Sequence, residues 1–330
     1  MSNLPDHGGG LDAARKRWTT FKGEWMDLST GINPCPYPPP SIPQDVWCRL
    51  PDAPLDLGLR MAAKDYYGLN NPENILATPG TGAIIRLLPQ LKPLGKTAIL
   101  GPTYSEHAQS WSDAGHHTQI VSSLDEASGA DVVIAVNPNN PNGHVITPSD
   151  LSSFALAHPN CFMVVDQAYG ELYPELSIIP NLPQNMVALA SFGKFFGLAG
   201  LRLGLVMGAP DILAALASRL GPWPVSGPAL FIGQQALMDK DWINNSRAHL
   251  SKLSLDLTHV LSEAHLEIIG GTALFHLVQC KDAFWLWDHF GQHGILTRIF
   301  SYDRTWLRIG LPPDQGGLNR LADCLANRRQ

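Results

Sequence analysis

The segment ASFGKFFGLAGLRLG, residues 190–204, joins two apolar runs and carries a single lysine, Lys194. Ser191 precedes this lysine, Arg202 follows it, and the segment contains no carboxylate. A lysine flanked by apolar residues usually lies along an apolar surface with its ammonium group in water. Two cations and a hydroxyl group without a nearby acid instead indicate an anion site, or a reactive amine whose pKa is lowered by desolvation and a neighbouring cation.

The apolar runs on either side of this segment belong to a longer pattern. Short runs rich in Val and Ile, with predicted helices or loops between them, occupy residues 97–102, 131–138, 161–169, 186–192 and 201–208. Continuous apolar strands of this kind are typical of an α/β fold in which helices cover both faces of a mostly parallel sheet. A helix is predicted from Leu57 to the glycine at position 68. Later runs at 270–280, 294–300 and 306–311 predict the strands of a smaller α+β unit.

Proline and glycine clusters divide the chain. Residues 32–43, INPCPYPPPSIP, contain prolines that exclude a regular helix or central strand, so an extended arm is expected. A second cluster at 221–228 predicts a hinge. We therefore expect an N-terminal arm with part of the small domain over 1–50, a large domain over 51–222, and a C-terminal small domain over 223–330.

Charge and hydropathy exclude several classes of protein. The 330 residues have a formal net charge of -6, which argues against nucleic acid as a partner. No apolar run reaches the ~18 residues of a membrane span, and the N-terminus lacks a secretory signal. We expect a cytoplasmic protein without a membrane partner. The 5 cysteines are scattered and form no C-x-x-C pair, which predicts reduced thiols.

Polar residues follow four of the predicted strands, at the ends where ligands bind in a parallel sheet. GTGA at 80–83 opens a predicted helix, and Asn140 follows the run at 131–138. Asp166 and Tyr169 end the run at 161–169, and Lys194 follows the run at 186–192. Taken singly, the glycines and the asparagine are equally typical of ordinary turns, and a buried acid is equally typical of a structural pair.

Together, in this order, the four strand ends resemble the fold type I enzymes, the aspartate-aminotransferase-like family that uses pyridoxal 5'-phosphate (PLP). The resemblance extends from about residue 27 to 310. It implies that Lys194 is the Schiff-base lysine, that Asp166 faces the pyridine nitrogen, and that Tyr169 completes the catalytic group. The same resemblance implies that Asn140 and Tyr169 bind the ring hydroxyl, Tyr104 stacks on the ring, and the cofactor phosphate is held by Gly80, Thr81, Gly82, Ser191 and Arg202.

The resemblance also implies the kind of substrate. Arg308 matches the family's carboxylate-binding arginine, and Arg298 matches a second arginine in the branch that acts on phosphorylated substrates. The segments HGGGLDAARKRW (7–18) and WMDLSTGINPCPYP (25–38) resemble the start of the threonine-phosphate decarboxylases of cobalamin biosynthesis, in which His7 and Asn33 would contact the substrate. That branch implies decarboxylation of L-threonine O-3-phosphate to (R)-1-amino-2-propanol O-2-phosphate without a metal, by a homodimer.

The chain departs from the family at four positions, and other functions stay open. Leu50 replaces a tyrosine, Gly193 a serine, Gln167 a glutamate and Asn142 a threonine. The first alternative is histidinol-phosphate aminotransferase or a related class I/II aminotransferase. The second is a non-catalytic PLP-binding protein. A nicotinamide-dependent dehydrogenase is disfavoured because GTGAII lacks the third glycine of the dinucleotide fingerprint.

Overall fold

The computed structural model describes residues 7–328, which form two compact units. The large unit contains residues 36–140 and 144–243, and within the described part of the chain the small unit contains 7–35, 141–143 and 244–328. No helix within the described residues is both long enough and apolar enough to cross a membrane.

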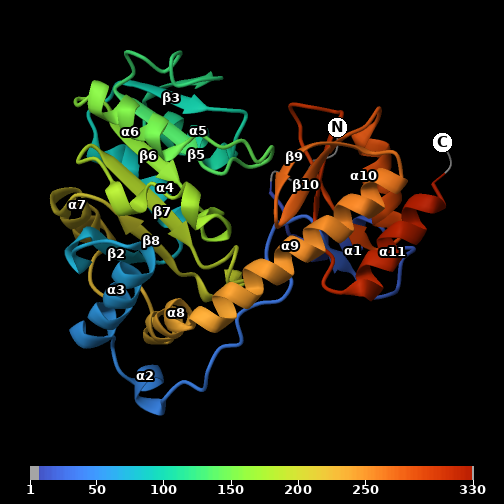
Figure 1. The fold of residues 1–330 in the computed structure, drawn as a ribbon, viewed down its shortest axis with the longest axis horizontal. Coiled ribbons are helices and arrows are strands. Elements are labelled where there is room, and N and C mark those ends of the chain that lie inside the picture. The colour runs from blue at the N-terminus through green and yellow to red at the C-terminus, as the bar shows by residue number, and fades with distance from the viewer. Residues whose placement is uncertain (1–6, 329–330) are drawn as a thin grey trace. The chain divides into compact units, whose positions relative to one another are not determined.

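The large unit is built on one sheet with the strand order β2-β8-β7-β6-β5-β3-β4. Only β8 runs antiparallel to its neighbours, so the predicted mostly parallel sheet is confirmed. Every residue of β5 and β6 is buried, because helices cover both faces of the sheet, and this explains why these runs are apolar throughout (Figure 1). The strands of this sheet are β2 (Ile75–Thr78), β3 (Lys96–Leu100), β4 (His117–Val121), β5 (Val132–Val136), β6 (Phe162–Asp166), β7 (Met186–Ser191) and β8 (Gly204–Met207).

The helices of the large unit bury apolar side chains against that sheet. Ile84 of α4 and Leu216 of α7 belong to the same buried cluster as Ile99, Val164 and Leu189 of the strands. The α-helices of the unit are α2 (Gln44–Cys48), α3 (Ala53–Tyr67), α4 (Thr81–Leu87), α5 (Ser105–Asp113), α6 (Pro148–Ala157), α7 (Pro210–Leu220) and α8 (Gly227–Met238). The predicted helix end is confirmed, because Gly68 terminates α3 in the left-handed conformation at φ 71°.

The small unit contains two sheets and three helices of its own. β1 (Met26–Asp27) pairs in parallel with β11 (Ile295–Leu296). A second, antiparallel sheet has the order β12-β13-β10-β9. The strands of this sheet are β9 (Glu267–Thr272), β10 (Phe275–Gln279), β12 (Arg298–Ile299) and β13 (Trp306–Gly310), and the helices are α1 (Leu11–Arg17), α10 (Ala283–Gln292) and α11 (Gln315–Ala326). The long helix α9 (Lys240–Glu263) begins in the large unit and continues into the small one.

Some elements differ from the sequence prediction. β4 was not predicted, because its residues HTQIV are largely exposed at the edge of the sheet and so show no apolar run. The run at 270–280 divides between β9 and β10, with a turn at which the backbone N–H of Leu274 donates to Oγ1 of Thr272 (3.2 Å). Residues 32–43 contain neither helix nor strand, as their prolines predict.

The compact units divide the chain at 35/36 and 243/244, beyond the proline- and glycine-rich segment at 221–228. The physical reason is that α8, which begins within that segment, packs on α3 of the large unit. A Cβ on Gly233 would lie 2.3 Å from Cδ2 of Leu203 and 3.1 Å from Cδ1 of Leu59, so α8 approaches this unit very closely. These units are defined by packing, and the domain bounds given from the sequence stay a prediction.

The buried cluster of the large unit predicts a large difference between two leucines on helices. Leu216 of α7 is completely buried, whereas Leu156 of α6 is 73% exposed. We expect Leu216→Ala to lower the free energy of unfolding by about 2 to 5 kcal/mol, and Leu156→Ala to change it by less than about 0.5 kcal/mol. Urea unfolding followed by circular dichroism measures both values. Equal values for the two variants would contradict the described packing.

Candidate active site

The residues predicted to bind the cofactor lie at one edge of the large unit's sheet. Gly80 follows β2 after one residue, Tyr104 precedes α5, and Asn140 follows β5. Asp166 and Ser191 are the last residues of β6 and β7. These strands all run in the same direction, so their carboxyl ends meet at one edge, where ligands bind in sheets of this kind.

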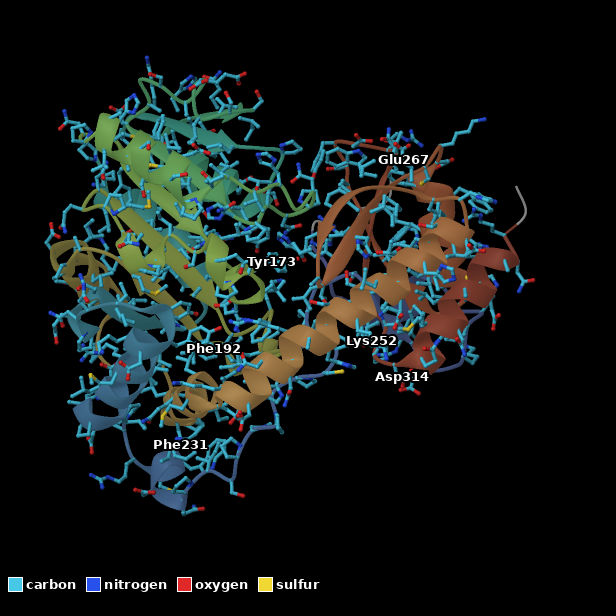
Figure 2. All side chains as sticks on the ribbon, in the orientation of Figure 1. Tyr173, Phe192, Phe231, Lys252, Glu267 and Asp314 are labelled. Carbon is cyan, nitrogen blue, oxygen red and sulfur yellow. The ribbon has the colours of Figure 1, made fainter. Side chains whose placement is uncertain are left out.

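Lys194 is half-buried above a closely packed aromatic cluster. Its Nζ lies 5.6 Å from the centroid of the Tyr169 ring, and that ring is almost completely buried. Phe192, labelled in Figure 2, stacks on Phe196 with the ring centroids 5.0 Å apart, and Phe195 meets Phe196 edge to face. The apolar residues around Lys194 are therefore part of the core, and they hold the backbone that carries the amine.

Asp166 is buried, with 4% of its surface exposed, and two polar groups contact its carboxylate. Oδ1 accepts the backbone N–H of Ala168 (3.0 Å), and Oδ2 lies 3.0 Å from Nε2 of His107 on α5. Since a carboxylate only accepts, Nε2 of His107 carries the donated proton. Sequence reasoning required a partner for a buried acid but did not identify His107. The only available signal was its position three residues after Tyr104.

Arg202 lies against the turn that follows β2. A Cβ on Gly80 would lie 2.8 Å from Nη2 of Arg202, so a side chain at this position would fill the space beside the guanidinium group. Gly80 has φ 80°, a value that glycine adopts without strain, and it is the N-cap of α4, in which Thr81 and Gly82 are the first residues. The guanidinium group and the start of a helix thus lie at one place, an arrangement that fits a phosphate group.

Ser191 and Tyr104 are two further residues of the large unit that are predicted to bind the cofactor. The hydroxyl group of Ser191 accepts the N–H of Gly193 (3.3 Å), within the turn that leads to Lys194. Burial raises the pKa of Tyr104 to about 12, so this phenol stays protonated at neutral pH. The Tyr104 ring lies 6.1 Å from the His107 ring, between centroids, and so belongs to the environment of Asp166.

The departures from the family pattern have structural explanations at two positions. The amide oxygen of Gln167 accepts the N–H of Ile178 (3.3 Å), which ties the end of β6 to the following loop. The carbonyl oxygen of Asn142 accepts the N–H of Gly271 (3.0 Å), so residues 141–143 belong to the small unit. Leu50 is 61% exposed, and nothing in the large unit explains its choice.

The residues predicted to bind the substrate all lie in the small unit. Arg298 of β12 and Arg308 of β13 are directly opposite one another in the antiparallel register. Arg308 is buried, and its Nη2 donates to the carbonyl oxygen of Ser29. Like charges facing each other across two strands destabilise a sheet. The register thus places side by side the two arginines that were predicted to bind the acidic groups of the substrate.

Asn33 and His7 differ in how the structure places them. Asn33 is buried, its Nδ2 donates to Oγ of Ser246 (3.2 Å), and its Oδ1 accepts the N–H of Cys35 (2.8 Å). Its amide thus supports the backbone at residues 33–35. His7 is exposed and is the first residue that the structure describes. The structure brings the two arginines together in the small unit. It brings the residues that are predicted to bind the cofactor together in the large unit.

One group of side chains among residues 7–328 has ligand atoms close enough for a metal ion. It consists of His289, His293 and Cys324, with these atoms within 4.8 Å of one another. Nε2 of His289 is already engaged by the carbonyl oxygen of Cys324 (3.0 Å), and burial raises the pKa of the Cys324 thiol to about 11. One ring nitrogen of His289 is therefore already hydrogen-bonded within this group.

The sequence of this chain is similar to the sequences of known proteins. Residues 45–325 match the aminotransferase class I and II family. The chain belongs to that family. Among curated members, it is 44% identical over 326 residues to a threonine-phosphate decarboxylase from Sinorhizobium sp, with 97% of each chain covered. It is 39% identical over 326 residues to the threonine-phosphate decarboxylase of Pseudomonas aeruginosa, with 96% of each covered.

The fold of this class I and II family member is also found in a solved structure. The histidinol-phosphate aminotransferase of Sinorhizobium meliloti, solved in complex with PLP, superposes with a TM-score of 0.82 at 20% identity. The alignment covers 98% of this chain and 94% of that one. At this identity the likeness shows the fold, and it confirms the predicted fold type I architecture.

The buried pair at the end of β6 predicts the effect of removing its imidazole. His107→Ala leaves Oδ2 of Asp166 buried without this partner, so we expect the free energy of unfolding to fall by about 1 to 3 kcal/mol. His117→Ala, an exposed histidine on β4, is the matched control and should change it by less than about 0.5 kcal/mol. Urea unfolding without added cofactor measures both. If the two variants are equally stable, the pair contributes nothing to folding.

Proposed function

We propose that this protein is a PLP-dependent enzyme that decarboxylates L-threonine O-3-phosphate to (R)-1-amino-2-propanol O-2-phosphate, a step of cobalamin biosynthesis. The main support is the identity of 44% and 39% to two threonine-phosphate decarboxylases along almost the whole chain. The paired arginines of β12 and β13 add a physical reason, because a phosphorylated amino acid carries two separate anionic groups.

The cofactor is PLP, and the residues of the large unit fit it. Lys194 is the amine that would hold it covalently, and Asp166 would keep its pyridine nitrogen protonated, with His107 fixing the carboxylate. When bound, PLP accepts the electron pair released as the bond between Cα and the carboxyl carbon breaks. The remaining contacts are assigned to Tyr104 on the ring, to Asn140 and Tyr169 on the ring hydroxyl, and to Gly80, Thr81, Gly82, Ser191 and Arg202 on the phosphate.

The small unit would recognise the substrate by its two acids. We assign the carboxylate to Arg308, whose buried guanidinium group is planar and donates in a fixed direction. We assign the phosphate to Arg298, with His7 and Asn33 as further substrate contacts. For decarboxylation, Arg308 would bind and orient the carboxylate whose bond to Cα breaks. In a transaminase the bond that breaks would instead be that between Cα and its hydrogen.

The second candidate is histidinol-phosphate aminotransferase, whose fold this chain shares. Histidinol phosphate has only one acidic group, its phosphate, but glutamate, the product formed from 2-oxoglutarate in that reaction, has two, so the arginine pair alone favours neither reaction. The identity along the whole chain favours the decarboxylase.

We also propose a homodimer that acts in the cytoplasm. Sedimentation of the purified protein measures the oligomeric state.

Two assays on the purified protein separate the candidates. With PLP and L-threonine O-3-phosphate, we expect release of CO2 in equal amount to substrate consumed, without transfer of the amino group to 2-oxoglutarate. Formation of glutamate from histidinol phosphate and 2-oxoglutarate would instead establish the aminotransferase. A protein that binds PLP and supports neither reaction would be the non-catalytic alternative.

Covalent attachment tests the assignment of Lys194 without measuring turnover. After incubation with PLP and reduction with borohydride, mass spectrometry should detect the cofactor on the peptide that contains Lys194. Lys194→Ala should abolish this attachment, because the proposal assigns the aldehyde to this amine. Lys96→Ala, which removes an exposed lysine of β3, is the control and should leave it intact. Labelling at another lysine would refute the assignment.

The arginine pair predicts a loss of substrate affinity. A hydrogen bond to a charged group contributes about 1.5 to 3 kcal/mol, so Arg298→Ala and Arg308→Ala should each raise KM by about 10- to 100-fold. The absorption spectrum of the bound cofactor should stay unchanged in both variants. Arg304→Ala, an exposed arginine in the loop between β12 and β13, serves as the control. Unchanged KM in both pair variants would show that the anion site lies elsewhere.

A further inference from the structure

Ser29 is a buried residue of the small unit in which the side chain and both backbone polar groups are engaged. Its Oγ accepts the backbone N–H of Gly9 (2.7 Å) and donates to Oδ1 of Asp27 (2.6 Å). Its own N–H donates to the same oxygen of Asp27 (2.9 Å), and its carbonyl oxygen accepts Nη2 of Arg308. Only 2% of the residue's surface is exposed. One residue thus connects residues 7–10, called the N-terminal arm from here on, with the arginine assigned to the substrate carboxylate.

The arm also touches the carbonyl group that accepts from Arg308. A Cβ on Gly8 would lie 2.3 Å from the carbonyl oxygen of Ser29 and 2.8 Å from its carbonyl carbon. Any side chain at this position would displace either the arm or that carbonyl group. The absence of a side chain at Gly8 lets the backbone beside His7 lie directly on Ser29.

The segment that carries Ser29 is itself held between two strands. The N–H of Met26 donates to the carbonyl of Gly294 (2.9 Å), and the N–H of Leu28 donates to that of Leu296 (2.7 Å). On the other side, the N–H of Gly310 donates to the carbonyl oxygen of Leu28 (2.7 Å). Ser29 therefore has a fixed place beside β13, and displacing it requires breaking a run of backbone hydrogen bonds.

We propose that Asp27 and Ser29 form a positioning pair that fixes the N-terminal arm relative to Arg308, and so sets the specificity for substrates with two acidic groups. This inference rests on the proposed function. A serine hydroxyl suits the role because it accepts from Gly9 and donates to Asp27 at once, which alanine cannot do. The carboxylate of Asp27 orients the hydroxyl group by accepting from both Oγ and the backbone N–H.

The pair acts on the two ends of one substrate. The carbonyl oxygen of Ser29 orients the guanidinium group of Arg308 toward the carboxylate, and the hydroxyl group of Ser29 holds the arm that carries His7. If the hydroxyl group is lost, the arm is released and the second acid of the substrate loses a contact. Binding of the phosphorylated substrate then weakens, while the chemical step, which depends on the large unit, continues.

The test compares Ser29→Ala with wild type in the PLP-loaded protein. We expect KM for L-threonine O-3-phosphate to rise about tenfold, as for loss of one hydrogen bond, with kcat within about threefold. Amide hydrogen exchange of residues 8–10 should become faster, because Gly9 loses its acceptor. The absorption spectrum of the bound cofactor should stay the same, since the cofactor residues belong to the other unit.

Three further variants keep the inference testable if Ser29→Ala does not fold. Asp27→Asn retains an acceptor oxygen and should behave almost as wild type, whereas Asp27→Ala should raise KM as Ser29→Ala does. Gly8→Ala should raise KM by the clash with the Ser29 carbonyl group. Arg15→Ala, on the exposed face of α1, is the matched arm control and should change nothing.

The outcomes separate this inference from the proposed function. A wild-type protein that fails to release CO2 from L-threonine O-3-phosphate refutes the function, whatever the variants do. If wild type is active, an unchanged KM in Ser29→Ala, or a loss confined to kcat, overturns the positioning role. Unchanged amide exchange at residues 8–10 overturns it as well, and that measurement needs no substrate.

Discussion

A carboxylate can remain in the interior of a protein only if polar groups compensate for its lost water, and Asp166 meets this requirement at the end of β6. Its partners come from two directions, the backbone N–H of Ala168 and the imidazole of His107 on α5. This need links the central strands to the helix that follows β3. The same helix begins directly after Tyr104, so the compensation of one buried charge also places the aromatic ring assigned to the cofactor.

The small unit, in contrast to the buried acid of the large unit, contains two cations side by side. Arg298 and Arg308 face each other across neighbouring strands, and the backbone carbonyl of Ser29 partly compensates Arg308. Like charges at facing positions repel one another, and an anionic substrate bound there, as proposed, would reduce that repulsion. Charge placement is therefore complementary in the two units. The large one contains a buried acid suited to a protonated ring, and the small one contains a basic pair suited to acidic substituents.

The sequence was sufficient for the features that depend on local pattern. The apolar runs predicted β3, β5, β6, β7 and β8, since buried strands cannot alternate with polar residues. β4 was not predicted, because it lies at an edge of the sheet with most of its side chains exposed. His107 and Ser29 escaped for another reason: each acts through a contact with a residue far away in the chain, 59 and 279 positions from Asp166 and Arg308 respectively. No spacing rule reports such contacts.

The order in which the small unit's segments occur along the chain has a consequence for synthesis. Residues 7–35 leave the ribosome before the large unit, but β1 pairs with β11 at 295–296, and Leu28 accepts from Gly310. These residues therefore stay without their partners until residues 295–310 have been made. The large unit, whose strands lie closer together in sequence, has its parts available much earlier. A nascent chain halted before β11 would contain the large-unit residues that are assigned to the cofactor, but not the strands that pair with residues 26–28. The residues proposed to hold the cofactor are thus made before Arg298 and Arg308, which are proposed to bind the substrate.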